Sequence, residues 1–416
     1  MGEKLEPSAS VEIAKHTLMS GGLILAIGTL AGLLAQKIKV PDVAVFLLVG
    51  MLVGPQGLGL IDIRADSALN QIVLLFGASY VLFDGGASLR FSVLKQVWIT
   101  IVVLATVGVV ITAGLTAVAA HFALGIPAMT ALLLGCTIAP TDPATLVPIF
   151  RQVKIRDRVA QTVMSESAFN DATGAILTFA VLAVAMGTGE FSLTASLIDL
   201  VKEAVFGIVS GVLLGYLAAL LIAHERWAFL MEYAPVVTLV AVIGAYLVAD
   251  GLHASGFMAV FVFGMMIGNK DDFGFKMSKR DQQELDDYVL TTAFIMRLFI
   301  FLLLGSQVDF RLMNQYFLAG VIVVAIFMLI ARPVTVFLCA LPDRRARWQV
   351  SEILFMCWTR ETGVIPAALA GLLVGMNAPD SRVIASVTFI AILMTILIQA
   401  PTTKWLGRRL GLLDTN

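Results

Sequence analysis

The sequence predicts an all-α polytopic membrane protein, and three observations lead to this fold class. Of its 416 residues, 59% are hydrophobic and 14% are charged, whereas soluble domains have about 45–50% apolar and about 25% charged residues. The apolar residues form long unbroken runs, as a helix crossing a hydrocarbon core of about 30 Å requires. A transmembrane β-barrel would instead show alternating segments of about ten residues.

Thirteen apolar stretches are long enough to be membrane spans. They cover approximately residues 17–36, 40–60, 69–89, 97–121, 128–150, 159–187, 197–223, 233–250, 253–269, 288–306, 316–341, 350–375 and 383–407. We expect one transmembrane domain over residues 1–416, with spans 1–6 at about 17–187, a linker span at about 197–223 and spans 8–13 at about 233–407. The longest inside loop, Lys270–Asp287, predicts no soluble regulatory domain.

The positive charges predict the orientation of the chain. With the N-terminus outside, 19 of the 28 Lys and Arg residues fall on inside loops, six fall outside, and Arg297, Arg332 and Arg360 remain within apolar runs. Because inside loops carry the excess of positive charge, an N-outside, C-inside chain in the cell (inner) membrane fits this distribution. The balance of 28 basic and 29 acidic residues predicts no nucleic-acid partner.

Ionisable side chains within apolar runs mark candidate functional positions, since each costs at least about 2.5–3.5 kcal/mol in lipid. The first such run, Thr137–Thr145, contains Asp142. Prolines flank Thr141 and Asp142, and each removes an N–H and disfavours helix at the preceding residue. We expect a broken helix whose freed carbonyls face a cation or a side chain near mid-membrane, the alternative being a proline kink in a structural helix.

The second run holds two polar pairs. Glu166 and Asn170 are four residues apart, as are Ser167 and Asp171, so each pair shares a helix face. Carboxylate, hydroxyl and amide oxygens suit a hard monovalent cation, and one buried carboxylate can hold either a cation or a proton. The alternative for the two acidic residues is a structural pairing with arginines that joins helices.

The depths of the two aspartates agree. Asp171 lies thirteen residues past Arg158, about 20 Å along a helix. Asp142 lies nine residues before Arg151, about 14 Å from the same side if the segment is helical. We therefore expect both carboxylates near the middle of the membrane.

The third run, Trp358–Pro366, places Arg360 about 20 Å from the inside loop that precedes it. An arginine at that depth needs a carboxylate, and Glu166 is the expected partner. Gly363 and the proline at the end of the run indicate local unwinding, and Glu361 is expected to face elsewhere and reach water. The interrupted spans are then the fifth and the twelfth, which predicts two inverted repeats with span 7 as linker.

These motifs resemble the NhaP-type sodium/proton antiporters, the monovalent cation:proton antiporter-1 family. The resemblance extends from about residue 17 to 407 and is carried by Thr141-Asp142-Pro143, Glu166-Ser167 with Asn170-Asp171, Phe83-Asp84-Gly85-Gly86, and Arg360 with Gly363. It implies an NhaA/NhaP-like antiporter fold with two crossed, broken helices, and a homodimer. Its substrates would be Na⁺, Li⁺ or K⁺ and H⁺, with no cofactor.

The resemblance also implies how the ion is held. Asp171 matches the aspartate that binds the cation and exchanges the proton, and Ser167, Glu166 and the Thr141 region match its neighbours around the monovalent cation. In this superfamily an Asn-Asp pair, here Asn170 with Asp171, is associated with electroneutral one-for-one exchange.

Further positions follow the family less closely or have other roles. Asn170 and Asp142 match a pair that braces the broken helix against the sixth span, and Arg360 matches the arginine that bridges to Glu166. Asp84 stands where the family often has Glu, and a small or apolar residue is commoner at the position of Glu361. Arg297 is unexpected, and either pairs with Asp84 or Asp171 or extends toward the cytoplasm.

Together the residues predict a secondary antiporter, not an enzyme, which exchanges cytoplasmic Na⁺ for external H⁺ in pH and sodium homeostasis. A K⁺/H⁺ antiporter of the same fold is the alternative, since ion selectivity depends on fine oxygen placement. A sodium-coupled organic anion symporter is disfavoured, because Asp142 and Asp171 would repel an anion. An intramembrane aspartyl protease would carry a Gly-x-Gly-Asp string, which is absent, and an ion channel remains a further alternative.

Overall fold

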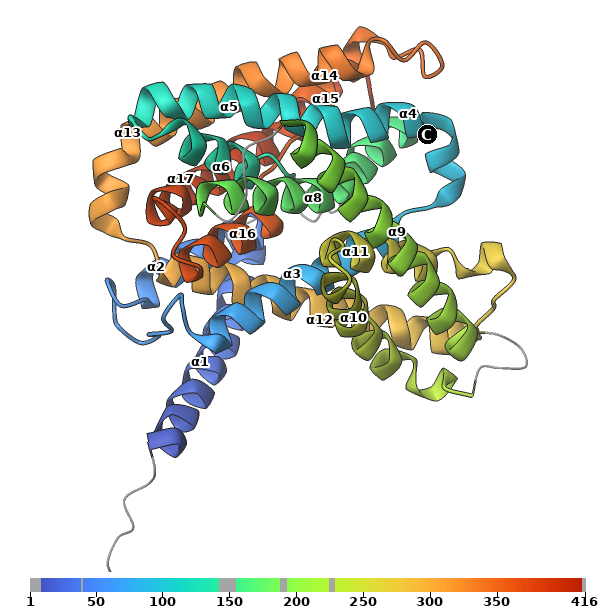
Figure 1. Cartoon of the computed structure of the whole chain (residues 1–416), viewed down its shortest axis with the longest axis horizontal. Helices are drawn as coiled ribbons and strands as arrows, with labels where there is room; N and C mark the ends of the chain where they lie inside the picture. Colours follow the sequence, from blue (N-terminus) through green and yellow to red (C-terminus); the bar gives the residue numbers. More distant parts are fainter. Residues whose placement is uncertain (1–8, 39, 142–154, 188–192, 224–228, 414–416) are drawn as a thin grey trace, which may run out of the picture.

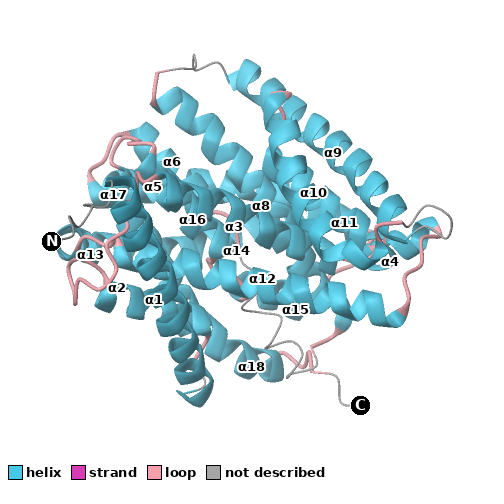
Figure 2. Ribbon diagram, turned by 90° about the horizontal axis from the view of Figure 1, so that it is seen from below, coloured by secondary structure: helices cyan, strands magenta, loops and turns pink. Residues whose placement is uncertain are grey.

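Helices make up nearly all of the regular structure (Figure 2). The structure is a computed structural model that describes residues 9–38, 40–141, 155–187, 193–223 and 229–413. Within these residues the β-type pairing is limited to an isolated antiparallel bridge between Ile155 and Leu413. The prediction of an all-α chain is confirmed.

The helices follow the predicted apolar stretches in order. In the first part of the chain they are α1 (Ala9–Ile38), α2 (Asp42–Val53), α3 (Ala68–Ser88), α4 (Phe91–Val103), the π-helical turn η1 (Leu104–Gly108), α5 (Val109–Leu124), α6 (Ala128–Ile138), α8 (Asp157–Ala185) and α9 (Leu193–Ala223). α4, η1 and α5 run on without a break, so they correspond to one predicted span.

The second part of the chain continues in the same way. Its helices are η2 (Met231–Tyr233), α10 (Ala234–Gly251), α11 (Gly256–Gly268), η3 (Lys270–Phe273), α12 (Lys279–Ser306), α13 (Phe310–Ile326), η4 (Phe327–Ala331), α14 (Arg332–Ala340), α15 (Val350–Trp358), α16 (Val364–Gly375), α17 (Ser381–Met394), η5 (Thr395–Gln399) and α18 (Ala400–Arg409). η4 and η5 are π-helical turns inside long helices, as is η1. Such turns are rare in proteins, and those that occur are often found at functional sites.

Within the described residues, nine helices are long and apolar enough to cross a membrane. Four shorter apolar helices, α2, α6, α11 and α16, fall within the other predicted stretches. A polytopic membrane protein is therefore the correct class, while the total of thirteen spans stays a prediction.

The interruption predicted in the twelfth span is present. α15 ends at Trp358 and α16 begins at Val364, directly after Gly363, and the residues between them are buried. In the fifth span, α6 ends at Ile138, just before the Thr141 region, as the prolines predict. The rest of that span, including Asp142, lies outside the described residues.

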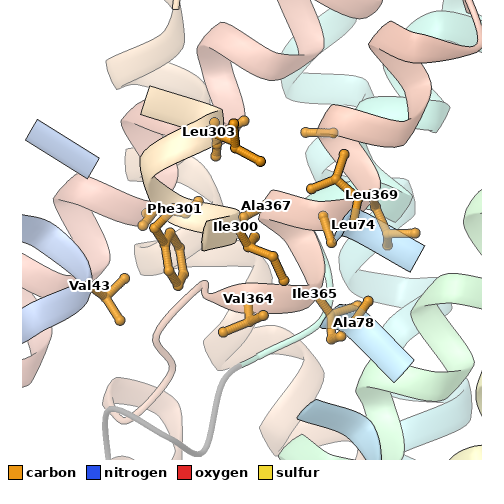
Figure 3. Close-up of a cluster of buried hydrophobic side chains, with 14 of the residues drawn as sticks. Val43, Leu74, Ala78, Ile300, Phe301, Leu303, Val364, Ile365, Ala367 and Leu369 are labelled. Carbon is orange, nitrogen blue, oxygen red and sulfur yellow. The ribbon is translucent and has the colours of Figure 1, made fainter. Parts of the chain in front are cut away.

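Close packing holds the helices together, because lipid is as apolar as the protein interior and offers little hydrophobic driving force. α3 and α11 cross at glycines: a Cβ on Gly264 would overlap the carbonyl oxygen of Phe83, and one on Gly268 would overlap that of Ala87. α16 packs against α3 and α12 (Figure 3), where the labelled side chains include Leu74, Ala78, Ile300, Phe301, Leu303, Val364, Ile365, Ala367 and Leu369.

One cluster of buried apolar side chains runs through α2, α3, α8, α11, α12, α16 and α17, and two further clusters define two groups of helices. One cluster joins α5, α6, α13 and α17, and another joins α3, α9, α10, α11 and α12. In Figure 1 these groups lie on either side of α8, which crosses the middle of the molecule. α8 carries Glu166, Ser167, Asn170 and Asp171, so the predicted site lies between the two groups.

Candidate ion-binding site

The site forms where the middle of α8 meets the end of α6. Thr141 follows α6, and Ser167, Asn170 and Asp171 lie within about one turn of α8. Their exposed fractions are 1% for Thr141, Ser167 and Asn170, and 5% for Asp171. The structure thus brings these predicted residues together in the interior of the helix bundle.

The side chain of Asn170 ties the end of α6 to α8. Its Oδ1 accepts a hydrogen bond from the backbone N–H of Thr141 at 3.0 Å, and its Nδ2 donates to Thr141 Oγ1 at 2.8 Å. Nδ2 also lies 3.4 Å from Glu166 Oε1 as a donor. Because the interaction needs both an acceptor and a donor, an amide fits this position and a carboxylate does not.

The hydroxyl groups complete the connection. Thr141 Oγ1 donates to Ser167 Oγ at 2.7 Å, so both oxygens lie beside the turn of α8 that bears Asp171. The backbone approach is close, since a Cβ on Gly174 would overlap the ring of Pro140. The hydroxyl groups of Thr141 and Ser167 and the amide of Asn170 therefore meet at the end of α6, against the turn of α8 that also carries the buried Asp171.

Glu166 forms a buried ion pair, with a partner that differs from the one predicted. Arg332 donates from Nη1 to Glu166 Oε1 at 2.6 Å and from Nη2 to Oε2 at 2.7 Å, and both side chains are 2% exposed. Arg332 Nε also donates to the carbonyl of Met356 at 3.1 Å. The expected bridge from Arg360 to Glu166 is corrected: both glutamate oxygens accept from Arg332, which begins α14 directly after the π-helical turn η4.

Arg360 instead connects the two interrupted spans. Its Nη2 donates to the carbonyl oxygen of Ala139, just after the end of α6, and its guanidinium lies 4.3 Å from the ring centroid of Phe327. That carbonyl is one of those freed when the helix ends. Arg360 therefore braces the break between α15 and α16 against the end of α6.

Two further residues at this break, Trp358 and Thr362, form hydrogen bonds to the last membrane-spanning helix. The N–H of Thr362 donates to Thr395 Oγ1 in the π-helical turn η5 at 3.1 Å, and Trp358 Nε1 donates to Thr402 Oγ1 at 2.8 Å. Glu361 is fully buried, so the expectation that it reaches water is wrong.

Asp84, Arg297 and Asp142 are three further residues of the prediction. Asp84 lies half-buried on α3, which also packs against α8. Arg297 lies on α12 and forms no ion pair with another described residue. Its Nε is buried without an acceptor in the part of the chain that the structure describes. Asp142 lies outside the described residues.

Sequence reasoning missed the role of Arg332 and the π-helical turns beside the site. Arg332 stood out as one of three arginines in apolar runs, and this was the available signal. Nothing in the residue types of η4 or η5 distinguishes them from ordinary helix.

The fold and the site define a class of protein: a secondary transporter with a buried carboxylate beside interrupted helices. Residues 22–409 match the family model described as sodium/hydrogen exchanger, transmembrane. The chain belongs to the sodium/hydrogen exchanger family, and the predicted resemblance is confirmed.

Individual relatives agree with this family. The chain is 31% identical to Na(+)/H(+) antiporter 1 of Methanocaldococcus jannaschii, over 93% of each chain. It is 29% identical to the K(+)/H(+) antiporter NhaP of Alkalimonas amylolytica, over 95% of this chain and 68% of that protein. The solved structure of the sodium proton antiporter MjNhaP1 from M. jannaschii at pH 8 superposes with a TM-score of 0.82 at 29% identity, covering 95% of this chain and 99% of that one. The antiporter fold is therefore confirmed.

Proposed function

We propose that this protein exchanges Na⁺ for H⁺ across the cell membrane and that Asp171 carries both ions in turn. The observation that supports this most directly is the burial of Asp171 beside the Thr141–Ser167–Asn170 network, in a membrane-spanning helix. A carboxylate and hydroxyl oxygens replace the hydration shell of a small cation, while a proton on the same carboxylate displaces it. Competition between the two ions makes the transport an exchange.

The charges around Asp171 favour an exchange of one Na⁺ for one H⁺. Glu166 makes a bidentate contact with Arg332, whose positive charge balances that of the carboxylate. Asn170 has no proton to exchange at this position. A single carboxylate then carries either one proton or one monovalent cation, so the loaded site has the same net charge in both directions.

Thr141, Ser167 and Glu166 are the proposed neighbours of the bound cation, and Asp142 and Asn170 the brace of the interrupted helix. Arg360 supports this brace through the carbonyl of Ala139. Asp84 is proposed to have a supporting role on α3. The transported ions are substrates, and we propose no cofactor and no enzymatic reaction.

The proposal also covers the orientation of the chain, its oligomeric state and the movement of its helices. The excess of Lys and Arg on one set of loops supports an N-outside, C-inside orientation in the inner membrane. A homodimer is proposed from the family alone. The two groups of helices on either side of α8 are suited to move against each other, which would expose Asp171 to each side in turn.

K⁺/H⁺ exchange is the second candidate, because the relative from A. amylolytica is named a K(+)/H(+) antiporter. The same carboxylate would serve, with oxygen distances adjusted to the larger ion. Proteoliposomes tested with Na⁺, Li⁺, K⁺ and Rb⁺ distinguish the two candidates by the cation that dissipates an imposed pH gradient.

The test of the site uses Asp171→Asn, with Asp250→Asn as the matched control. Asp250 is an exposed residue near the end of α10, outside the site. We expect Asp171→Asn to abolish cation-dependent proton movement in proteoliposomes and Asp250→Asn to retain it. Persisting exchange in Asp171→Asn would show that another group carries the ions.

A further inference from the structure

An apolar groove on the outer surface of the helix bundle lies between the α4–α5 helix and α9. It has a volume of about 720 Å³, and its lining is almost entirely apolar, with contributions from α4, η1, α5, α8, α9 and α11. Val107 on one wall is 51% exposed, and Val205 on the other is 50% exposed. Because this surface lies within membrane-spanning helices, the groove opens toward lipid.

A second hollow, lined by both polar and aromatic side chains, lies next to this groove. It has a volume of about 650 Å³, and its lining includes Ser92, Lys95, Trp98 and Asp272. Phe91 lines both cavities, so the two are neighbours. The ring of Phe91 also contacts that of Phe273 edge-on, at 6.1 Å between centroids, which joins the start of α4 to η3.

We propose that a phosphatidylethanolamine molecule binds here, with its headgroup at Ser92, Lys95 and Asp272 in the second hollow and an acyl chain in the apolar groove. Lys95 and Asp272 give the hollow one positive and one negative group, which complement a zwitterionic headgroup. The ammonium of Lys95 and the hydroxyl of Ser92 donate to the lipid phosphate, and the primary ammonium of the lipid donates to Asp272. Trp98 lies beside them, as tryptophans commonly do at the level of the headgroups.

The position of the groove gives the lipid a consequence for transport. Phe169 and Thr173 of α8 line it, and Asp171 lies between them in sequence. The groove is bounded by α4, η1 and α5 on one side and by α9 and α11 on the other, and α5 belongs to a different group of helices from α9 and α11. An acyl chain in this place contacts both groups, so exchange becomes dependent on the lipid that occupies the groove.

Binding is tested on the purified full chain by native mass spectrometry after exposure to phosphatidylethanolamine, phosphatidylcholine or phosphatidylglycerol. We expect preferential retention of phosphatidylethanolamine. Lys95→Gln should lower this retention about fivefold, equivalent to about 1 kcal/mol, while the exposed control Lys276→Gln should leave it unchanged. Equal retention of the three lipids, or a preference for phosphatidylglycerol, would overturn the assignment of the headgroup.

The groove is tested separately with Val205→Trp, which fills it, against Val118→Trp on an exposed face of α5. Only Val205→Trp should reduce lipid retention, with both variants keeping the thermal unfolding temperature of the parent. A change of oligomeric state with unchanged lipid retention would show that a second copy of the chain covers the groove, and would refute the proposal. Because retention is measured without ion flux, its failure is distinct from a failure of the proposed exchange.

Discussion

Replacing Arg332 by methionine tests how the interior of the site is held together. In the native structure Arg332 donates two hydrogen bonds to Glu166, at 2.6 and 2.7 Å, and a third to Met356. Arg332→Met removes all three and leaves Glu166 buried without a cation. Bulk water does not reach Glu166 to solvate its charge in place of Arg332, because both side chains are only 2% exposed.

The size of the effect follows from the fate of the glutamate. Losing one member of a buried ion pair costs about 3–5 kcal/mol. Neutralising a carboxylate of ordinary acidity at pH 7 costs about 3.7 kcal/mol, and this falls by about 1.4 kcal/mol for each unit of pH below 7. In the variant Glu166 adopts whichever form costs less, buried and charged or neutralised. We therefore expect the free energy of unfolding to drop by about 3–4 kcal/mol at pH 7 and by clearly less at pH 5.5.

Chemical unfolding of the detergent-solubilised variants, followed by tryptophan fluorescence, measures this loss. Arg382→Met is the control, since Arg382 is exposed at the start of α17. The double variant Glu166→Gln with Arg332→Met should recover about 2 kcal/mol or more, because it buries no charge. A loss in Arg332→Met that is below 1 kcal/mol, or that does not change with pH, would show that Arg332 does not stabilise the fold through buried Glu166.

Three further changes have defined outcomes. Asn170→Asp removes the donor to Thr141 and should lower the free energy of unfolding by about 1–3 kcal/mol, while a change below 0.5 kcal/mol would show that the donor is dispensable. Gly174→Ala should cost about 1–3 kcal/mol by overlap with Pro140, whereas Gly114→Ala, which has open space around it, should be neutral or stabilising in the same unfolding assay. Burial disfavours the ionised form of Asp343, but hydrogen bonds from the hydroxyl of Thr100 and the N–H groups of Ala346 and Arg345 outweigh it and hold its pKa below the usual value of 3.8. The ionised group therefore stabilises the fold fully above pH 3.8, and this contribution is lost as the pH falls through the lowered pKa of the folded state. Asp343→Asn should destabilise the protein at pH 7 and progressively less below pH 4, and an equal loss at both pH values would contradict this assignment.

The sequence predicted most of the helices because lipid imposes a simple rule on their length and composition. The break after Trp358 was also predictable, because Gly363 and Pro366 both destabilise the interior of a helix. The four-residue spacing of Glu166 with Asn170 placed both side chains on one face of α8, where the structure has them interacting.

The partner of Glu166 could not be predicted in this way. Arg332 lies twelve residues before Arg344 in the inside loop, about 18 Å along a helix, and Arg360 lies at nearly the same depth. Depth along a helix therefore does not distinguish the two arginines, and the choice depends on which helices are neighbours. In the structure α14 carries Arg332 to Glu166, while the break between α15 and α16 turns Arg360 toward Ala139.

The charge moved in each transport cycle shows most directly whether the single carboxylate of Asp171 carries both ions. Sodium-driven proton movement is measured in proteoliposomes with the membrane voltage clamped by K⁺ and valinomycin, first at zero and then at about 100 mV of either sign. We expect the same initial rate of Na⁺/H⁺ exchange at all three voltages. A rate that rises with one polarity and falls with the other would show that each cycle moves net charge across the membrane, which would contradict one-for-one exchange at a single carboxylate.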